Sequence, residues 1–213
     1  MIFHCVFTEN EWGQISPNVD SGTCRTAYNK IDYQFVGGYM RYGDGTAYRQ
    51  EFAYNRDKAV QYAHRWAKGR NPAYLDFENL GGDCTNFASQ CIYTGSGVMN
   101  YVPTHGWYYI SSYNRTPSWT GVNYLYNFIV ENNGAGPYAE IVDVKDAKPG
   151  DIAQLSFSGG GFFNHSPVII QTGSVPDINN ILVAAHTDDV DYYPLTGYDW
   201  VDIRFIHILG VRV

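Results

Sequence analysis

The chain has 213 residues and a formal net charge of -7, with 14 Lys and Arg against 21 Asp and Glu. Hydrophobic residues make up 45% of it and aromatic residues 16%, which excludes a disordered chain because such chains are poor in apolar side chains. The acidic balance argues against a general binder of nucleic acid or anionic membranes, since both need clustered Lys and Arg. No apolar run reaches the ~18–20 residues of a membrane span, and the length favours one main domain.

The first 52 residues differ from the rest and are predicted to form an N-terminal extension of unknown role. They are rich in Gly and Tyr and alternate in polarity near 33–36 and 39–42, which favours short strands or an extended arm. The opening residues lack the basic and apolar regions of a signal peptide. We therefore expect either an intracellular chain or one whose leader lies outside this sequence. The aromatic-rich, charge-poor composition favours an extracellular or cell-wall location, and a cytoplasmic one stays open.

Four cysteines are present: Cys5, Cys24, Cys84 and Cys91. No C-x-x-C or H-E-x-x-H pattern occurs, so neither a metal nor another cofactor is predicted. Cys84 and Cys91 would lie roughly 10 Å apart on one helix, too far for a disulfide. Cys5 and Cys24 can pair in an oxidising compartment and remain thiols in a reducing one.

Helices are predicted first along the chain. Apolar residues at helical spacing indicate helices over 55–68, about 84–94 and 118–133. Ser118 is the expected N-cap of the third helix, and Gly134 its expected C′ residue.

Strands follow. Segments 151–155, 166–172, 181–186 and 203–213 are separated by turn residues. Helices followed by an antiparallel sheet predict an α+β fold with the helices packed on one side of the sheet.

A cysteine begins the second predicted helix in the stretch Gly81-Gly82-Asp83-Cys84-Thr85-Asn86-Phe87. A helix N-terminus carries a partial positive charge and unpaired N–H groups, which favour a thiolate and can bind an oxyanion. Cys84 is therefore predicted to be a partly exposed nucleophile with a low pKa, and Cys91 a buried, inert thiol. The alternative is that Cys84 is a small buried residue and that Asp83 only caps the helix.

A thiolate nucleophile needs an imidazole partner. His165 begins one predicted strand and His186 ends the next. If the hairpin pairs Val168 with Val183, His165 lies opposite His186, where Cβ atoms are about 5 Å apart. His165 would then be the base and His186 the group that orients it, with Asp188 as the alternative third residue.

The residues quoted so far carry a resemblance. The stretches Asn71-Pro72, Gly81–Cys91, Ser118-Trp119, Lys148–Asp151, His165-Ser166 and Ala185–Thr187 resemble the amidase-domain family of bacteria, which is often attached to cell-wall proteins. That family is similar to the NlpC/P60 and CHAP papain-like cysteine peptidases. The resemblance covers about 53–212, so residues 53–213 are assigned to a papain-like amidase domain.

The resemblance implies an NlpC/P60-like fold and a cysteine amidase or peptidase that hydrolyses an amide bond through a thioester. By carry-over, Cys84 is the nucleophile, His165 the base and His186 the third residue, and Tyr74 helps to shape the oxyanion site. Asp83 and the clustered aromatic residues Trp107 and Tyr108 are predicted to contact the substrate with Tyr74. The implied partner is a peptide or peptidoglycan; the oligomeric state is left open.

Two other functions stay open on the sequence alone. The aromatic residues could form a binding platform on a catalytically silent scaffold at the cell wall. Alternatively, an amine could capture the same thioester, as in transglutaminases, because the acyl-enzyme half-reaction is shared.

Overall fold

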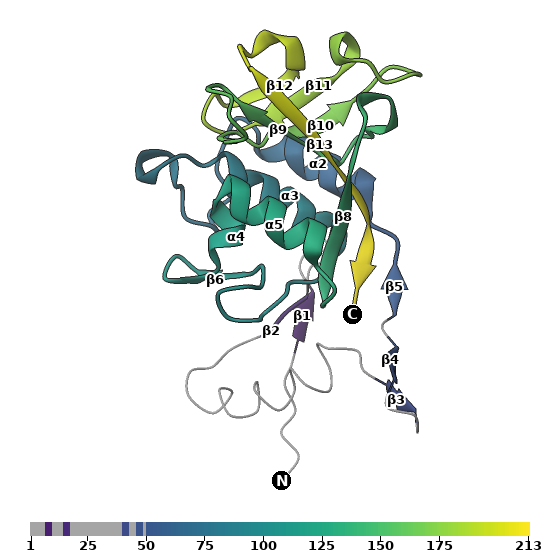
Figure 1. Cartoon of the computed structure of the whole chain (residues 1–213). Helices are drawn as coiled ribbons and strands as arrows, with labels where there is room; N and C mark the ends of the chain where they lie inside the picture. The colour runs from purple at the N-terminus through teal and green to yellow at the C-terminus, as the bar shows by residue number, and fades with distance from the viewer. Residues whose placement is uncertain (1–6, 10–14, 18–39, 43–45, 49) are drawn as a thin grey trace.

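The computed structural model describes residues 7–9, 15–17, 40–42, 46–48 and 50–213 (Figure 1). Strand β1 (Phe7–Glu9) pairs with β2 (Ile15–Pro17), and β3 (Met40–Tyr42) pairs with β4 (Thr46–Tyr48), both antiparallel. The strand expected over 39–42 is thus confirmed for 40–42. The strand expected at 33–36 and the possible Cys5–Cys24 pair lie outside the described residues.

One seven-stranded antiparallel sheet organises the described part of the chain from residue 50 onward. Its order is β12-β11-β10-β9-β13-β5, and β8 also pairs with β13. The long strand β13 pairs with β9 through residues 202–206 and with β8 through residues 205–212, so it joins two parts of a curled sheet (Figure 1). The bounds are β5 (Glu51–Phe52), β8 (Gly136–Val142), β9 (Ile152–Ser156), β10 (Val168–Gln171), β11 (Leu182–Ala185), β12 (Val190–Pro194) and β13 (Asp202–Arg212).

The four predicted strands correspond to β9, β10, β11 and β13 and are confirmed to within about two residues at each end. Strand β5 extends the sheet by pairing with the end of β13 at residues 211–212. Strands β8 and β12 were not predicted from the sequence. The α+β class is confirmed, because helices and an antiparallel sheet form separate parts of the fold.

Helices α2 (Arg56–Trp66) and α3 (Cys84–Ser96) confirm the first two predicted helices. The single helix predicted over 118–133 is wrong: α4 (Pro117–Thr120) and α5 (Val122–Glu131) are separated by Gly121, whose backbone is extended. Thr116 rather than Ser118 is the N-cap of α4, and Asn132 ends α5. No helix among the described residues is long and apolar enough to span a membrane.

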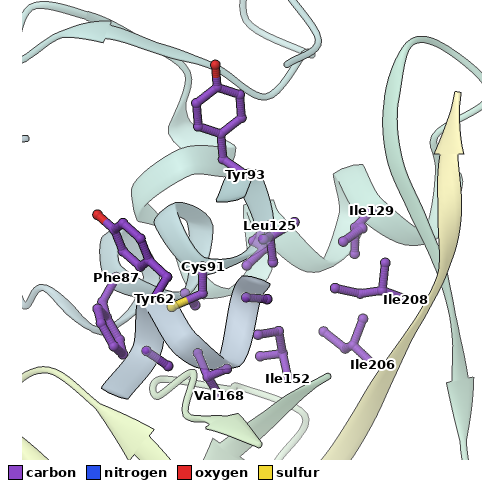
Figure 2. Packing of buried hydrophobic residues seen from close by; sticks show 14 of the residues in the cluster. Tyr62, Phe87, Cys91, Tyr93, Leu125, Ile129, Ile152, Val168, Ile206 and Ile208 are labelled. Atoms are coloured by element: carbon purple, nitrogen blue, oxygen red, sulfur yellow. The ribbon is translucent and has the colours of Figure 1, made fainter. Parts of the chain in front are cut away.

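Helix α3 lies at the centre of the core. Every residue from Cys84 to Gly95 is buried, because α2, α4, β8 and β11 all contact this helix. Figure 2 shows the sulfur of Cys91 among the apolar side chains of Tyr62 from α2, Leu125 from α5 and Val168 from β10. The predicted burial of Cys91 is therefore confirmed.

Polar side chains of α3 are buried too, and four of them bind a partner from another segment. A buried polar group without a partner would cost about 1–3 kcal/mol, so these bonds determine which elements can pack on α3. The bonds are Thr85 to Ser166, Asn86 to Trp119, Ser89 to Trp107 and Gln90 to Tyr62.

The turn at Pro149-Gly150 leads to the buried carboxylate of Asp151. Asp151 accepts hydrogen bonds from Arg56 at 2.6 Å, His207 at 2.7 Å and the backbone N–H of Ile208 at 3.0 Å. These contacts hold the start of α2 against β13. His207 thus has a structural role here.

The core position of Trp107 predicts that this side chain contributes to the stability of the fold. Trp107 is 0% exposed, and its indole N–H donates to Ser89 at 3.0 Å. We expect Trp107→Ala to lower the free energy of unfolding by about 3–5 kcal/mol, the usual cost of removing a buried aromatic side chain. Urea unfolding measures the loss. Tyr113→Ala is the matched control, since Tyr113 is 99% exposed, and an equal loss in both variants would contradict this placement.

Candidate active site

Cys84 and His165 line the same pocket, which has a volume of about 590 Å³. Gly81 and Gly82 form the wall before α3. The opposite wall comes from the sheet and its loops, through residues of the segments 157–165, 187–190 and 193–199. Cys84 and His165 are 81 positions apart in the sequence and were predicted to act together. The fold brings them to one site.

The backbone before the cysteine explains the paired glycines. Gly81 has φ +115° and Gly82 has φ +103°, a region that glycine adopts without steric cost. A Cβ atom on Gly82 would lie 3.7 Å from the side-chain oxygen of Thr187. These two glycine conformations therefore lead the chain into the N-terminus of α3. Because glycine has no side chain, both positions leave the pocket open beside Cys84.

The Cys84 thiol is more buried than predicted, at 7% exposure. Burial raises the pKa of Cys84, although the Thr85 side chain and the backbone N–H groups of Ser166 and Thr85 act to lower it. Desolvation disfavours the charged form, and here it outweighs the hydrogen bonds. The expectation of a partly exposed thiol with a low pKa is therefore wrong.

His165 is held at the edge of the sheet, next to β9. It forms an antiparallel bridge with Leu155, whose backbone N–H donates to the His165 carbonyl at 3.0 Å. The imidazole is 4% exposed, and burial lowers the pKa of His165 to about 4, with the charge of Asp188 acting in the opposite direction. At neutral pH the site therefore holds a neutral imidazole beside a protonated thiol.

The segment that carries His165 is fixed by a chain of hydrogen bonds. Ser166 accepts from Thr85 of α3 and from Gln154 of β9, both at 3.2 Å. Arg204 of β13 in turn donates to the Gln154 side-chain oxygen at 2.6 Å. Helix α3 and the segment that carries His165 are thus tied together by Thr85 and Ser166, the residues that follow Cys84 and His165.

His186 does not lie where the predicted hairpin register puts it. Val168 pairs with Ala184 rather than with Val183, and a slip of one residue turns the side chains to the other face. The His186 ring nitrogens instead lie 2.5 Å from an Asp83 oxygen and 2.8 Å from the Trp66 carbonyl oxygen. The expectation that His186 faces His165 is therefore wrong.

Asp83 is fully buried and holds neighbouring segments together; it does not line the pocket. Its carboxylate accepts from the Phe77 backbone N–H at 2.9 Å and from the Asn86 side chain at 2.8 Å, in addition to its contact with His186. The Arg70 guanidinium lies 3.6 Å away. Asp83 is 0% exposed and makes no side-chain cap bond, so neither predicted role, substrate contact or simple cap, describes it.

The predicted aromatic contacts also lie elsewhere. Trp107 is in the core, Tyr74 stacks on Trp119 at 5.8 Å between ring centroids, and Tyr108 packs beside Tyr101 at 5.5 Å. None of the three lines the pocket of Cys84 and His165.

Other aromatic residues do line it: Phe157, Tyr193 and Tyr198. They come from the sheet half of the chain, where sequence reasoning named no aromatic residue. Asp188, the alternative third residue, also lines the pocket, and its charge acts on His165.

Comparison with known proteins agrees with the extent of this domain. Residues 53–209 match the model of a family described as "Putative amidase domain". The chain is also 35% identical over 175 residues to uncharacterized protein YhbB of Bacillus subtilis, a match covering 76% of this chain and 53% of that protein. The chain thus spans about half the length of this curated relative. No solved structure matches it.

The Asp83–His186 contact generates a prediction about stability. Removing one partner from a buried hydrogen-bond network costs about 1–3 kcal/mol, and more where the group is charged, because the remaining groups stay buried without compensation. We expect Asp83→Asn to lose stability on this scale in urea unfolding. Asp189→Asn is the control: Asp189 also contacts Arg70, at 2.8 Å, but its side chain is 47% exposed. An exposed pair contributes about 1 kcal/mol or less. Similar losses of stability in the two variants would argue against a structural role for the buried Asp83 carboxylate.

Proposed function

The chain belongs to the amidase-domain family that matches residues 53–209, and we propose that it hydrolyses an amide bond with Cys84 as the nucleophile. Family membership supports amide hydrolysis in general. The cysteine mechanism is supported by one observation above all: Cys84 at the N-terminus of α3 and His165 of the sheet line a single pocket.

In the proposed mechanism, His165 accepts the Cys84 proton as the sulfur attacks the amide carbonyl carbon. The resulting oxyanion is stabilised by the N–H groups of the first turn of α3, which have no partner within the helix. The C–N bond then breaks, the amine leaves with the proton from His165, and a thioester remains on Cys84. Water, deprotonated by His165, hydrolyses the thioester and restores the free thiol.

Cys84 and His165 are both uncharged at neutral pH, and this affects when the proton is transferred. Burial disfavours both the thiolate of Cys84 and the imidazolium of His165. We therefore propose that proton transfer accompanies attack on the bound substrate, rather than preceding substrate binding. The hydrogen bonds already directed at the Cys84 sulfur lower the cost of forming the thiolate at that moment.

The pocket also favours some substrates over others. Among the residues that the structure describes, two carboxylates line it, Asp188 and Asp199, and no Lys or Arg does, so a neutral or cationic group beside the scissile amide suits it better than an acidic one. We propose a peptide substrate, and within that class a peptidoglycan peptide, because of the resemblance to domains of cell-wall proteins. An extracellular or cell-wall location follows from that substrate. A papain-like fold related to the NlpC/P60 and CHAP enzymes is part of the proposal, supported by the order of helix cysteine and sheet histidine.

The proposal predicts that Cys84→Ala abolishes hydrolysis. Purified peptidoglycan is digested with the wild type and the variant, and the products are identified by mass spectrometry. New amine and carboxyl ends should appear only with the wild type, and Cys91→Ala should retain activity because Cys91 is confined to the core. Full activity of Cys84→Ala would refute cysteine catalysis.

The same digest distinguishes the alternatives. Binding of peptidoglycan by the wild type without any product would favour a binding module. Products joined to an added amine would favour acyl transfer.

The pKa of His165 predicts the acid side of the pH profile. His165 must be neutral to accept the thiol proton, and burial lowers its pKa to about 4. Activity should therefore persist as the pH falls below 6.5 and be lost as it passes through about 4. Since Asp188 acts to raise the pKa of His165, Asp188→Asn should move this limb to lower pH. The pH dependence of kcat/KM measures both effects, and a limb near the ordinary histidine pKa of about 6.5 would contradict them.

A further inference from the structure

Two buried polar atoms beside the nucleophile have no hydrogen-bond partner among the described residues: Nε2 of His165 and the hydroxyl oxygen of Tyr198. Their rings are neighbours, with centroids 5.1 Å apart and planes at 60°, and both residues line the pocket of Cys84. An unsatisfied buried group costs about 1–3 kcal/mol. Two such atoms on adjacent rings at a reactive site therefore call for a functional explanation.

The two atoms are chemically complementary. A neutral imidazole that accepts the Cys84 proton at Nδ1 carries its own N–H at Nε2. That N–H needs an acceptor, and a tyrosine hydroxyl oxygen can accept while its O–H donates elsewhere.

The other candidates for this role are otherwise engaged or exposed. Both nitrogens of His186 are used by Asp83 and the Trp66 carbonyl, and the side chain of Asp188 is exposed. Tyr198 is thus the pocket residue whose polar group is buried and without a partner beside the His165 ring.

We propose that Tyr198 is the positioning residue for His165, with its hydroxyl oxygen holding the Nε2–H of the imidazole directly or through one buried water. The inference rests on the proposed function of Cys84 and His165 and names the third member of that site. It replaces the role that the sequence assigned to His186.

The tyrosine ring is well placed to act in this way. It packs edge-on against Tyr193 at 5.0 Å, and its backbone N–H donates to the Leu195 carbonyl at 3.4 Å, directly after a short 3-10 turn, η5 (Leu195–Gly197). Burial and, after it, the nearby charge of Asp188 raise the pKa of Tyr198. The hydroxyl therefore stays protonated over the working pH range, and the orienting contact does not titrate away.

Tyr198→Phe tests the proposal, because it keeps the ring and removes only the hydroxyl. Tyr113→Phe is the matched control: it removes the same hydroxyl from a tyrosine that is 99% exposed and is not among the residues that line the pocket. Iodoacetamide is the probe, and alkylation of Cys84 is followed by mass spectrometry, so no substrate is needed. We expect alkylation at neutral pH to slow about tenfold in Tyr198→Phe, since the base is misoriented, and to change less than twofold in Tyr113→Phe.

A second measurement uses the wild-type protein alone. In ¹⁵N NMR, assigned with the help of His165→Ala, the His165 ring should be the neutral Nε2–H tautomer with a slowly exchanging proton, and Tyr198→Phe should make that proton exchange rapidly. The opposite tautomer in the wild type, or a Tyr198→Phe variant with unchanged alkylation and exchange, would overturn the inference.

The two proposals fail in different ways. Slow alkylation of Tyr198→Phe together with full hydrolysis by Cys84→Ala would leave the positioning contact intact and refute the proposed function. An inactive Cys84→Ala together with normal alkylation and kcat in Tyr198→Phe would refute only the role of Tyr198.

Discussion

The buried carboxylate of Asp83 is the contact on which the arrangement of this domain depends. It joins the loop before α3, through Phe77, to α3 itself, through Asn86, and to the end of β11, through His186. His186 extends the connection to α2 by its contact with the Trp66 carbonyl. A charge at 0% exposure is tolerated only where such partners surround it. The residue before the proposed nucleophile thus sets the position of the helix N-terminus relative to the sheet.

The polar residues that follow Cys84 extend the same principle along α3. Asn86 and Ser89 each bind a tryptophan indole, and Gln90 binds a tyrosine hydroxyl. What makes this stretch recognisable as a motif is therefore largely its packing: each polar side chain is satisfied by a different part of the fold. The proposed chemistry needs Cys84 and His165, whereas the neighbouring motif residues hold the segments that carry them together. Most residues of the motif around Cys84 therefore pack in the core, and few of them line the pocket.

Burial has opposite consequences for structure and for reactivity at this site. The packing that fixes Cys84 and His165 also removes water from them, which raises the pKa of the thiol and lowers that of the imidazole. Position on a helix N-terminus predicts the reverse for the cysteine, because local electrostatics favour the thiolate. Which effect prevails depends on how much of the surrounding chain covers the sulfur. The exposure of a side chain is set by segments far away in sequence, such as Ser166 and the loop carrying Tyr198.

The sequence alone determined the α+β class, helices α2 and α3, and the strands β9, β10, β11 and β13, and it singled out Cys84 and His165, which line one pocket. Hydrophobic periodicity, turn residues and a motif are local signals, and local signals suffice for these. Only the tertiary structure decided the one-residue register of β10 on β11, because the connection contains a 3-10 helix, η4 (Ile178–Asn180), and a bulge interrupts the pairing. That register turned His186 toward Asp83 and left His165 beside Tyr198. The tertiary structure also separated core from pocket: Trp107 and Tyr198 are alike as amphipathic aromatic residues, and only long-range packing buried one and set the other beside His165.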